Sequence, residues 1–583
     1  MKNIILLLIA SFLTFSCTNK VNQDSSTIYG VLDANIPGLD PIQANNKYSS
    51  RIIAQIHEGL YHYHYFKRPL ELEPQLAESM PKVSKDGLTY TIKIKKNIFF
   101  QDDSAFPNNK GRELTANDFI YSWKRLADPS NKALSWWVFD GKIKGLNEWR
   151  ESFQKAKATY ESPIEGLNAP DKYTLVIKLT RPFYQFNLLL AMPSTFVVAK
   201  EVVEKYGKEI INHPVGTGPY KLARWVRNSE VRLEKNPTFR NETYPSEGTK
   251  EDKEKGFLAD AGKKLPLTDT ISIKIIPERQ PLWLSFMKGQ LDHGIVPKDN
   301  FSQVFDGKQI RQEILDKKIG IHMQYRPDYT YFTFNMEHPV LGKNHNLRKA
   351  MAYAYDIQTS LEKFYNHRGI ESNGPIPPGL DGYDPNYKKP IHYDLKKAKE
   401  YMEKAGFPEG KGAPTLNLEL ANSGSWSRQM GEFVKNQMAL IGLNIKITSN
   451  TWPQFDKKVK SKKADIFQVA WNADYPDAEN FLQLYYSKNV SPGSNNANFM
   501  NREYDSMYEK AASLPPGKAR TELYKKMVIF LNEKTPAIFL IHRIYRLPFH
   551  GWLKNYNEYP VVHDFYKYLR VDEKEKEELL KKL

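Results

Sequence analysis

Apolar and polar residues alternate in four segments of the chain, with the period of two that is typical of a strand with one buried face. In residues 88–94 and 173–179, aromatic and aliphatic side chains occupy every second position. Residues 271–275 and 443–447 repeat this pattern. The alternation therefore predicts a strand at each of these four places.

Two other segments space their apolar residues as a helix does. Thr115 and Asp118 have the spacing of a capping box, and residues 119–126 then place their large apolar side chains on one helical face. A second helical pattern runs over residues 430–441 and ends at Gly442, a residue type that commonly terminates helices. Because helices and strands interleave along the chain, we predict an α/β or mixed fold.

Three segments lack such patterns. Residues 18–27 are small and polar, which is typical of a flexible tether. Residues 241–264 are rich in Glu, Lys, Gly, Thr and Ser, so we expect a long surface loop inserted between two strands. Residues 574–583 are dominated by charge and predict a terminal helix or tail.

The N-terminus has the features of an export signal. Residues 4–13 form an apolar run that is too short to cross a bilayer but fits the core of a signal peptide. Residues 14–16 precede Cys17 and resemble the lipobox of bacterial lipoproteins. We expect removal of residues 1–16, acylation of Cys17, and anchoring by lipid to a membrane that faces the periplasm or the cell exterior. Ordinary secretion, with a free thiol at Cys17, remains the alternative.

Composition narrows the class of protein. A chain of 583 residues suggests several domains, and 40% hydrophobic residues can build large cores. The net charge of +17 is spread along the whole chain, which favours a solvated basic surface over nucleic-acid binding. One cysteine excludes an internal disulfide, a cysteine-based zinc cluster and an iron–sulfur site.

The chain offers little sign of catalysis or metal binding. His62 and His64 share one face of a possible strand, but no third ligand is evident near them, and the alternating tyrosines favour a packed strand. Asp474 and Asp477 could imitate a general acid/base pair, yet a proline-containing turn explains the same composition. Sequence motifs of phosphate loops, serine hydrolases and zinc proteases are absent. We expect a non-enzyme without cofactors.

Four segments, in order along the chain, resemble the bacterial solute-binding proteins that feed oligopeptide ABC importers, family 5. The clearest are PVGTGPYKL at 214–222 and WNADYPD at 471–477. The others are LEPQLAES at 72–79, followed by DGLTY and a TAND helix start, and FNM with LRKA and AYD within residues 334–356. The resemblance extends from about residue 28 to residue 570.

This resemblance implies the fold of a large periplasmic binding protein, with two hinged α/β lobes and an inserted extra domain. The implied limits are 28–65, 191–325 and 536–573 for a discontinuous lobe I, 66–190 for the inserted domain and 326–535 for lobe II. An oligopeptide would bind between the lobes. A membrane permease would recognise the closed, monomeric receptor.

The resemblance also implies a binding site. From the residues alone, Asp474 follows an apolar strand and either holds a cationic group or organises a turn. In the family, the aspartate of this motif binds the α-ammonium of the ligand. Two edges would pair with the peptide backbone, and Trp471 would wall a side-chain pocket. These edges would consist of Asn45, Asn46 and Lys47 on one side and Ala470, Trp471 and Asn472 on the other.

One position departs from the family pattern, and it leaves ligand preference open. Some members carry an arginine three residues before the tryptophan, where this chain has Gln468. Other solutes also remain alternatives, because the same fold binds nickel complexes, oligosaccharides, opines and signalling peptides. A surface adhesin or sensor that has lost transport is the alternative from another functional class.

Overall fold

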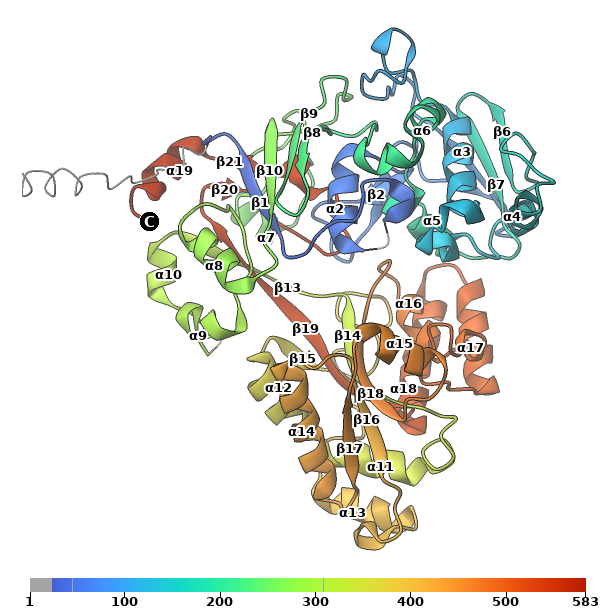
Figure 1. Cartoon of the computed structure of the whole chain (residues 1–583), viewed down its shortest axis with the longest axis vertical. Coiled ribbons are helices and arrows are strands. Elements are labelled where there is room, and N and C mark those ends of the chain that lie inside the picture. Colours follow the sequence, from blue (N-terminus) through green and yellow to red (C-terminus); the bar gives the residue numbers. More distant parts are fainter. Residues whose placement is uncertain (1–23, 45, 308) are drawn as a thin grey trace, which may run out of the picture.

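The computed structural model describes residues 24–44, 46–307 and 309–583. Within these residues, the fold contains three sheets of four or more strands (Figure 1). Cys17 and Asn45 lie outside the described residues. We use lobe I, inserted domain and lobe II as names for the residue ranges given above. The limits between these domains remain a prediction.

The first sheet lies in lobe I, and its strand β1 ends at the space between the lobes. Its order is β1-β10-β9-β8, with β1 and β10 parallel and the other pairs antiparallel. These strands are β1 (Ile28–Leu32), β8 (Tyr220–Val226), β9 (Glu230–Lys235) and β10 (Thr270–Ile275). Two-stranded pairs are β2 (Tyr61–Tyr63) with β3 (Leu72–Pro74), β11 (Phe305–Asp306) with β12 (Gln309–Ile310), and β20 (Leu553–Lys554) with β21 (Arg570–Val571).

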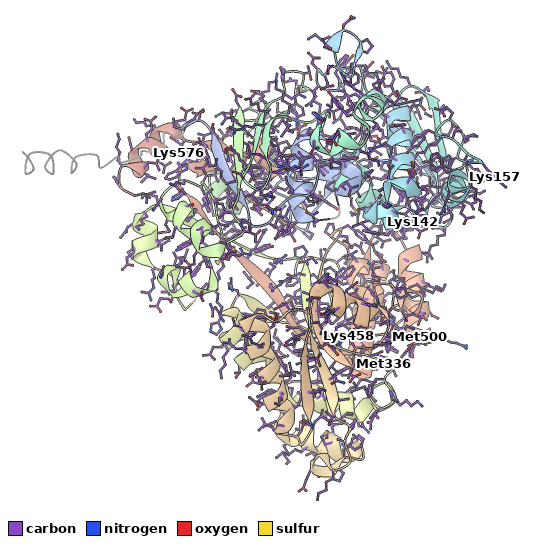
Figure 2. The ribbon with its side chains drawn as sticks, in the orientation of Figure 1. Lys142, Lys157, Met336, Lys458, Met500 and Lys576 are labelled. Atoms are coloured by element: carbon purple, nitrogen blue, oxygen red, sulfur yellow. The ribbon has the colours of Figure 1, made fainter. Side chains whose placement is uncertain are left out.

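Lobe I also contains short helices. They are α2 (Lys47–Ile56), α6 (Lys200–Tyr206), α7 (Lys250–Glu254), α8 (Arg279–Met287), α9 (Phe301–Val304), α10 (Gln312–Asp316) and α19 (Glu573–Leu580). The region 241–264 connects β9 to β10 as predicted, and it contains helix α7 as well as loop. Residues 574–583 are mostly helical in α19, whose Lys576 is fully buried and forms an ion pair with Asp292 at 3.1 Å (Figure 2).

The inserted domain has its own sheet but shares a core with lobe I. Its order is β4-β5-β7-β6, from β4 (Lys82–Val83), β5 (Thr89–Lys93), β6 (Leu167–Asp171) and β7 (Thr174–Lys178). Its helices are α3 (Ala116–Ala127), α4 (Leu146–Gln154) and α5 (Phe186–Leu189). The predicted capping box is confirmed, since the Thr115 amide donates to Asp118 at 2.8 Å. Trp123 of this helix packs in the apolar cluster that also holds Ile28 of lobe I.

The third sheet is the largest and joins the two lobes. Its order is β13-β19-β14-β18-β16-β17, and β15 also pairs with β19. The strands are β13 (Ile319–Tyr325), β14 (Asp328–Phe334), β15 (Gly369–Glu371), β16 (Leu416–Leu420), β17 (Ile445–Ser449), β18 (Ile466–Asn472) and β19 (Ala537–His550). The long strand β19 pairs first with β14 of lobe II and further along with β13 of lobe I, so it connects the two lobes within one sheet (Figure 1).

Helices cover both faces of this sheet in lobe II. Phe332 and Phe334 of β14 pack in one apolar cluster, and Tyr329 and Tyr331 pack in another, as the strand period of two requires. The helices are α11 (His345–Ala354), α12 (Ile357–Tyr365), α13 (Leu395–Lys404), α14 (Ser425–Ala439), α15 (Trp452–Lys460), α16 (Glu479–Leu482), α17 (Arg502–Ser513) and α18 (Lys518–Lys534). Among the described residues, none of the helices is long and apolar enough to span a membrane.

Most sequence-based element predictions are confirmed. The four alternating segments overlap β5, β7, β10 and β17. The pattern at residues 430–441 lies within α14 and the turn that ends it at Gly442, whose φ is +75°. His62 lies on β2 and contacts the carboxylates of Asp564 at 3.0 Å and Glu73 at 3.2 Å. These two contacts give His62 a structural role between lobe I and the inserted domain.

Candidate functional site: a cleft between the lobes

A cleft of about 1540 Å³ lies between lobe I and lobe II. Residues from β1, the start of α2, the loop 293–298, the end of β18 and the middle of β19 line it. Every predicted site residue that the structure describes belongs to this lining. These residues are Asn46, Lys47, Ala470, Trp471, Asn472 and Asp474.

Strand β18 offers an unpaired edge to the cleft. On one side, β18 pairs with β14 along its whole length, from Ile466 to Asn472. On the other side, β16 pairs only with Ile466 and Phe467, because β16 ends at Leu420. Within the described chain, residues 468–472 therefore have no strand neighbour on that side. Their outward backbone amides and carbonyls can pair with an extended ligand.

Asp474 follows this edge and is held by Asn480. The Asn480 amide nitrogen donates to the Asp474 carboxylate at 3.1 Å, and the Asn480 oxygen accepts from the Asp474 backbone amide at 3.1 Å. The same oxygen accepts from the Trp471 indole at 2.9 Å. The fully buried Asn480 thus fixes the acid and the aromatic ring relative to each other.

The Asp474 carboxyl has no cationic partner among the described residues. Burial raises its pKa to about 6, although the hydrogen bond from Asn480 acts in the opposite direction. A carboxylate in this state is stabilised by any cation that enters the cleft, because the local water is already partly removed. The arrangement favours an ammonium group of a ligand beside Asp474.

The lobe I side differs from the expected strand edge. Asn46 caps helix α2, since its side-chain oxygen accepts from the amides of Tyr48 and Ser49 at 3.0 Å each. Lys47 is the first residue of that helix, and burial lowers its pKa to about 8. At this point the cleft is therefore lined by the capped start of helix α2, and these residues do not form a strand edge.

Sequence reasoning missed the arginines at the hinge. The Asp328 carboxylate is fully buried and contacts Arg543 Nε at 2.6 Å and Arg326 Nε at 3.2 Å. Arg326 also donates to the Asn472 side chain at 2.8 Å, which links the hinge to the β18 edge. Gln468, by contrast, does not line the cleft, and its amide donates to the Tyr365 hydroxyl at 3.4 Å.

The inserted domain also touches lobe II. Gln185 of the inserted domain donates to the Tyr524 hydroxyl of α18 at 3.3 Å, and that hydroxyl donates to Asp477 at 3.0 Å. Lys142 lies at the same border (Figure 2). Burial lowers the pKa of this lysine, and the charge of Glu479 in lobe II partly offsets the effect.

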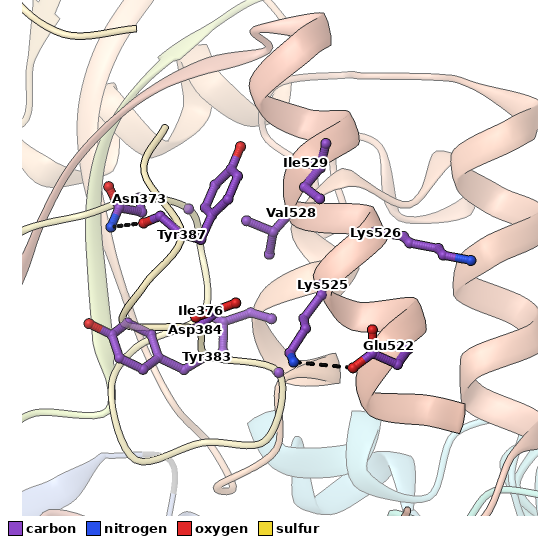
Figure 3. A pocket seen from close by; sticks show the side chains of 12 residues that line it. Asn373, Ile376, Tyr383, Asp384, Tyr387, Glu522, Lys525, Lys526, Val528 and Ile529 are labelled. Atoms are coloured by element: carbon purple, nitrogen blue, oxygen red, sulfur yellow. Dashed lines mark hydrogen bonds and ion pairs between the residues drawn. The ribbon is translucent and has the colours of Figure 1, made fainter. Parts of the chain in front are cut away.

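A second, smaller cavity of about 340 Å³ lies within lobe II, away from the cleft. Figure 3 shows it between α18 and the loop that carries Asn373 and Tyr387. Two polar pairs bond within its lining: Lys525 contacts Glu522 at 3.1 Å, and Asn373 donates to the Tyr387 carbonyl at 2.8 Å. The large cleft is the stronger candidate, because only there does an unpaired acid meet an open strand edge.

Replacing Asp474 by asparagine should stabilise the empty protein at neutral pH. The folded state raises the pKa of this acid from 3.8 to about 6, so ionisation costs stability above about pH 6, and the cost fades as the pH falls toward 4. We expect the melting temperature of Asp474→Asn to exceed that of the wild type by about 2 °C at pH 7.5 and by less at pH 4.5.

The control for this comparison is Asp299→Asn, which changes an exposed acid. Its melting temperature should follow the wild type at both pH values. Equal melting of Asp474→Asn and wild type across the pH range would contradict the view that Asp474 is an uncompensated acid.

The chain is similar in sequence to several known binding proteins. The glutathione-binding protein GsiB of Escherichia coli is 26% identical over 518 residues, with 87% of each chain covered. The dipeptide-binding protein of E. coli K12 is 24% identical over 498 residues, covering 83% of this chain and 84% of the relative. Heme-binding protein A of Haemophilus influenzae is 25% identical over 519 residues, covering 87% of this chain and 86% of the relative.

Solved structures share the fold. The periplasmic binding protein DppA of Helicobacter pylori, in complex with the peptide STSA, superposes with a TM-score of 0.70 at 23% identity, covering 94% of this chain and 99% of DppA. The family model of the bacterial extracellular solute-binding proteins, family 5, matches residues 71–493. The chain therefore belongs to the bacterial extracellular solute-binding proteins of family 5.

Proposed function

We propose that this protein binds oligopeptides in the cleft between its lobes and delivers them to an ABC import permease. The observation that carries the proposal is the open edge of β18 followed at once by Asp474. The edge can pair with a peptide backbone whatever its side chains are, and the acid can bind the N-terminal ammonium. Relatives named for glutathione and dipeptide binding support a peptide-like ligand.

Trp471 would complete the binding site. The indole of Trp471 is half-buried at the β18 edge and can wall the pocket of a side chain. A cleft of about 1540 Å³ has room for several residues together with bridging water, which allows varied sequences to bind. Lobe closure around the ligand would supply the differential affinity that a transport receptor needs.

The proposal includes export and anchoring. Residues 1–16 would be removed as a signal peptide, and acyl chains on Cys17 would tether the protein to a membrane facing the periplasm or the cell exterior. Residues 18–27 would form the linker between lipid and lobe I. A mature protein isolated from membranes should carry these acyl chains on its N-terminal tryptic peptide, which mass spectrometry measures directly.

Native mass spectrometry of the purified mature protein tests the ligand. We expect small peptides to copurify and to be released on denaturation. Asp474→Ala should lose them, since removing one partner of a desolvated charge pair weakens binding by on the order of 100-fold. Asp299→Ala, which changes an exposed acid, should keep them. Release of heme, a sugar or a metal complex, or peptides that persist in Asp474→Ala, would contradict the proposal.

A further inference from the structure

The cleft carries more positive charge than its own acids balance. Eight lysines and arginines line it, against three carboxylates. The basic residues are Lys47, Arg51, Arg279, Lys298, Arg326, Arg368, Arg543 and Arg546, and the acids are Asp33, Asp474 and Glu558. Binding the backbone of a neutral peptide does not require this excess of cations.

Four of these eight cations form an ion pair with a described carboxylate. Arg51 forms an ion pair with Glu558, and Arg279 contacts Asp33 at 2.5 Å. The two hinge arginines share the carboxylate of Asp328. Two arginines of the cleft remain without an ion pair to any described carboxylate, and both lie beside the ring of Phe301. They are Arg368 and Arg546.

Arg546 is the more deeply placed of the two. It lies on β19 with 8% of its surface exposed, and its Nε and Nη1 atoms have no hydrogen-bond partner among the described residues. Its guanidinium carbon lies 5.2 Å from the ring centre of Phe301 and 4.7 Å from that of Phe305. Two aromatic faces compensate a buried cation only in part, and its unused N–H groups still require an acceptor.

Arg368 approaches the same ring from lobe II. Its guanidinium carbon lies 5.7 Å from the ring centre of Phe301, and its Nε donates to the Tyr365 carbonyl at 3.2 Å. Burial lowers the pKa of Arg368, and the charge of Arg546 lowers it further. The two guanidinium groups near Phe301 therefore repel each other, and an anion that contacts both would offset that repulsion.

We propose that Arg368 and Arg546 form an anion-binding subsite that takes a carboxylate of the ligand, so that peptides with an acidic group are preferred. This inference rests on the proposed peptide-binding function and adds its specificity. The planar, fork-shaped donors of arginine match the two oxygens of a carboxylate. Because Arg546 lies in lobe I and Arg368 in lobe II, the carboxylate would also link the lobes.

The subsite is separate from the position where the family pattern places an arginine. Gln468 occupies that position, and its amide bonds to Tyr365 outside the cleft lining. Ligand acids would therefore be recognised at the β19 side of the cleft. Asp474, the one cleft acid without a cationic partner among the described residues, would bind the amino end.

Isothermal titration of matched tetrapeptides tests this subsite. The probes are tetra-alanine with a single Glu at each position in turn, the corresponding Gln peptides, and tetra-alanine with a free or amidated C-terminus. In the wild type, at least one acidic probe should bind about tenfold or more tightly than its neutral counterpart, as expected for charge-assisted hydrogen bonds. Arg368→Gln and Arg546→Gln should each abolish this advantage.

The controls separate the subsite from the binding function and from folding. Neutral probes should bind both variants as they bind the wild type, and Arg224→Gln, at an exposed position on β8, should keep the acidic preference. Melting curves check that the variant of the buried Arg546 is folded, and the half-buried Arg368 provides a second, independent variant.

Equal affinity for acidic and neutral probes in the wild type, or an acidic preference that survives both substitutions, overturns the subsite alone. Absence of binding by every probe overturns the peptide-binding function together with it.

Discussion

The buried carboxylate of Asp328 is the interaction on which the cleft depends. It lies where β14 leaves the hinge, and it contacts Arg543 of β19 at 2.6 Å and Arg326 of the preceding turn at 3.2 Å. These two arginines belong to the two connections that pass between the lobes. A single fully buried acid thus holds both crossing strands, and removing one partner of such a group is expected to cost about 3–5 kcal/mol. Through Arg326 and Asn472, the same group positions the open edge of β18.

The binding site combines features that oppose stability. An unpaired strand edge leaves backbone groups without partners, and Asp474 keeps a carboxylate in surroundings that raise its pKa to about 6. Neither feature is needed to hold lobe II together, since its sheet is packed by apolar clusters on both faces. Both features become favourable when an extended chain with an ammonium group enters the cleft. The cost in the empty state is therefore the source of affinity in the filled state.

Sequence patterns predicted the half-buried strands and the capped helix, because alternation and capping boxes are local signals. The hinge strands β14 and β19 were not predicted from periodicity. Every residue of β14 is buried, and the adjacent Tyr331 and Phe332 break its alternation of polar and apolar residues. Asp474, Trp471 and Asn472 were predicted through the family motif, and the structure places all three at one cleft. The expected strand edge at Asn46 and Lys47 is a helix start, which the capping role of Asn46 explains. Arg368 and Arg546 lie far apart in the sequence, and only the folded chain brings both to the ring of Phe301.

The central claim is that Asp474 binds the free amino group of a peptide whose backbone pairs with the β18 edge. Titration calorimetry with trialanine and N-acetyl-trialanine measures this most directly. The account predicts that trialanine binds at least tenfold more tightly at pH 7.5, and that the difference narrows near pH 5, where Asp474 becomes protonated in the empty cleft. Equal affinity of the two peptides at pH 7.5 would contradict the account.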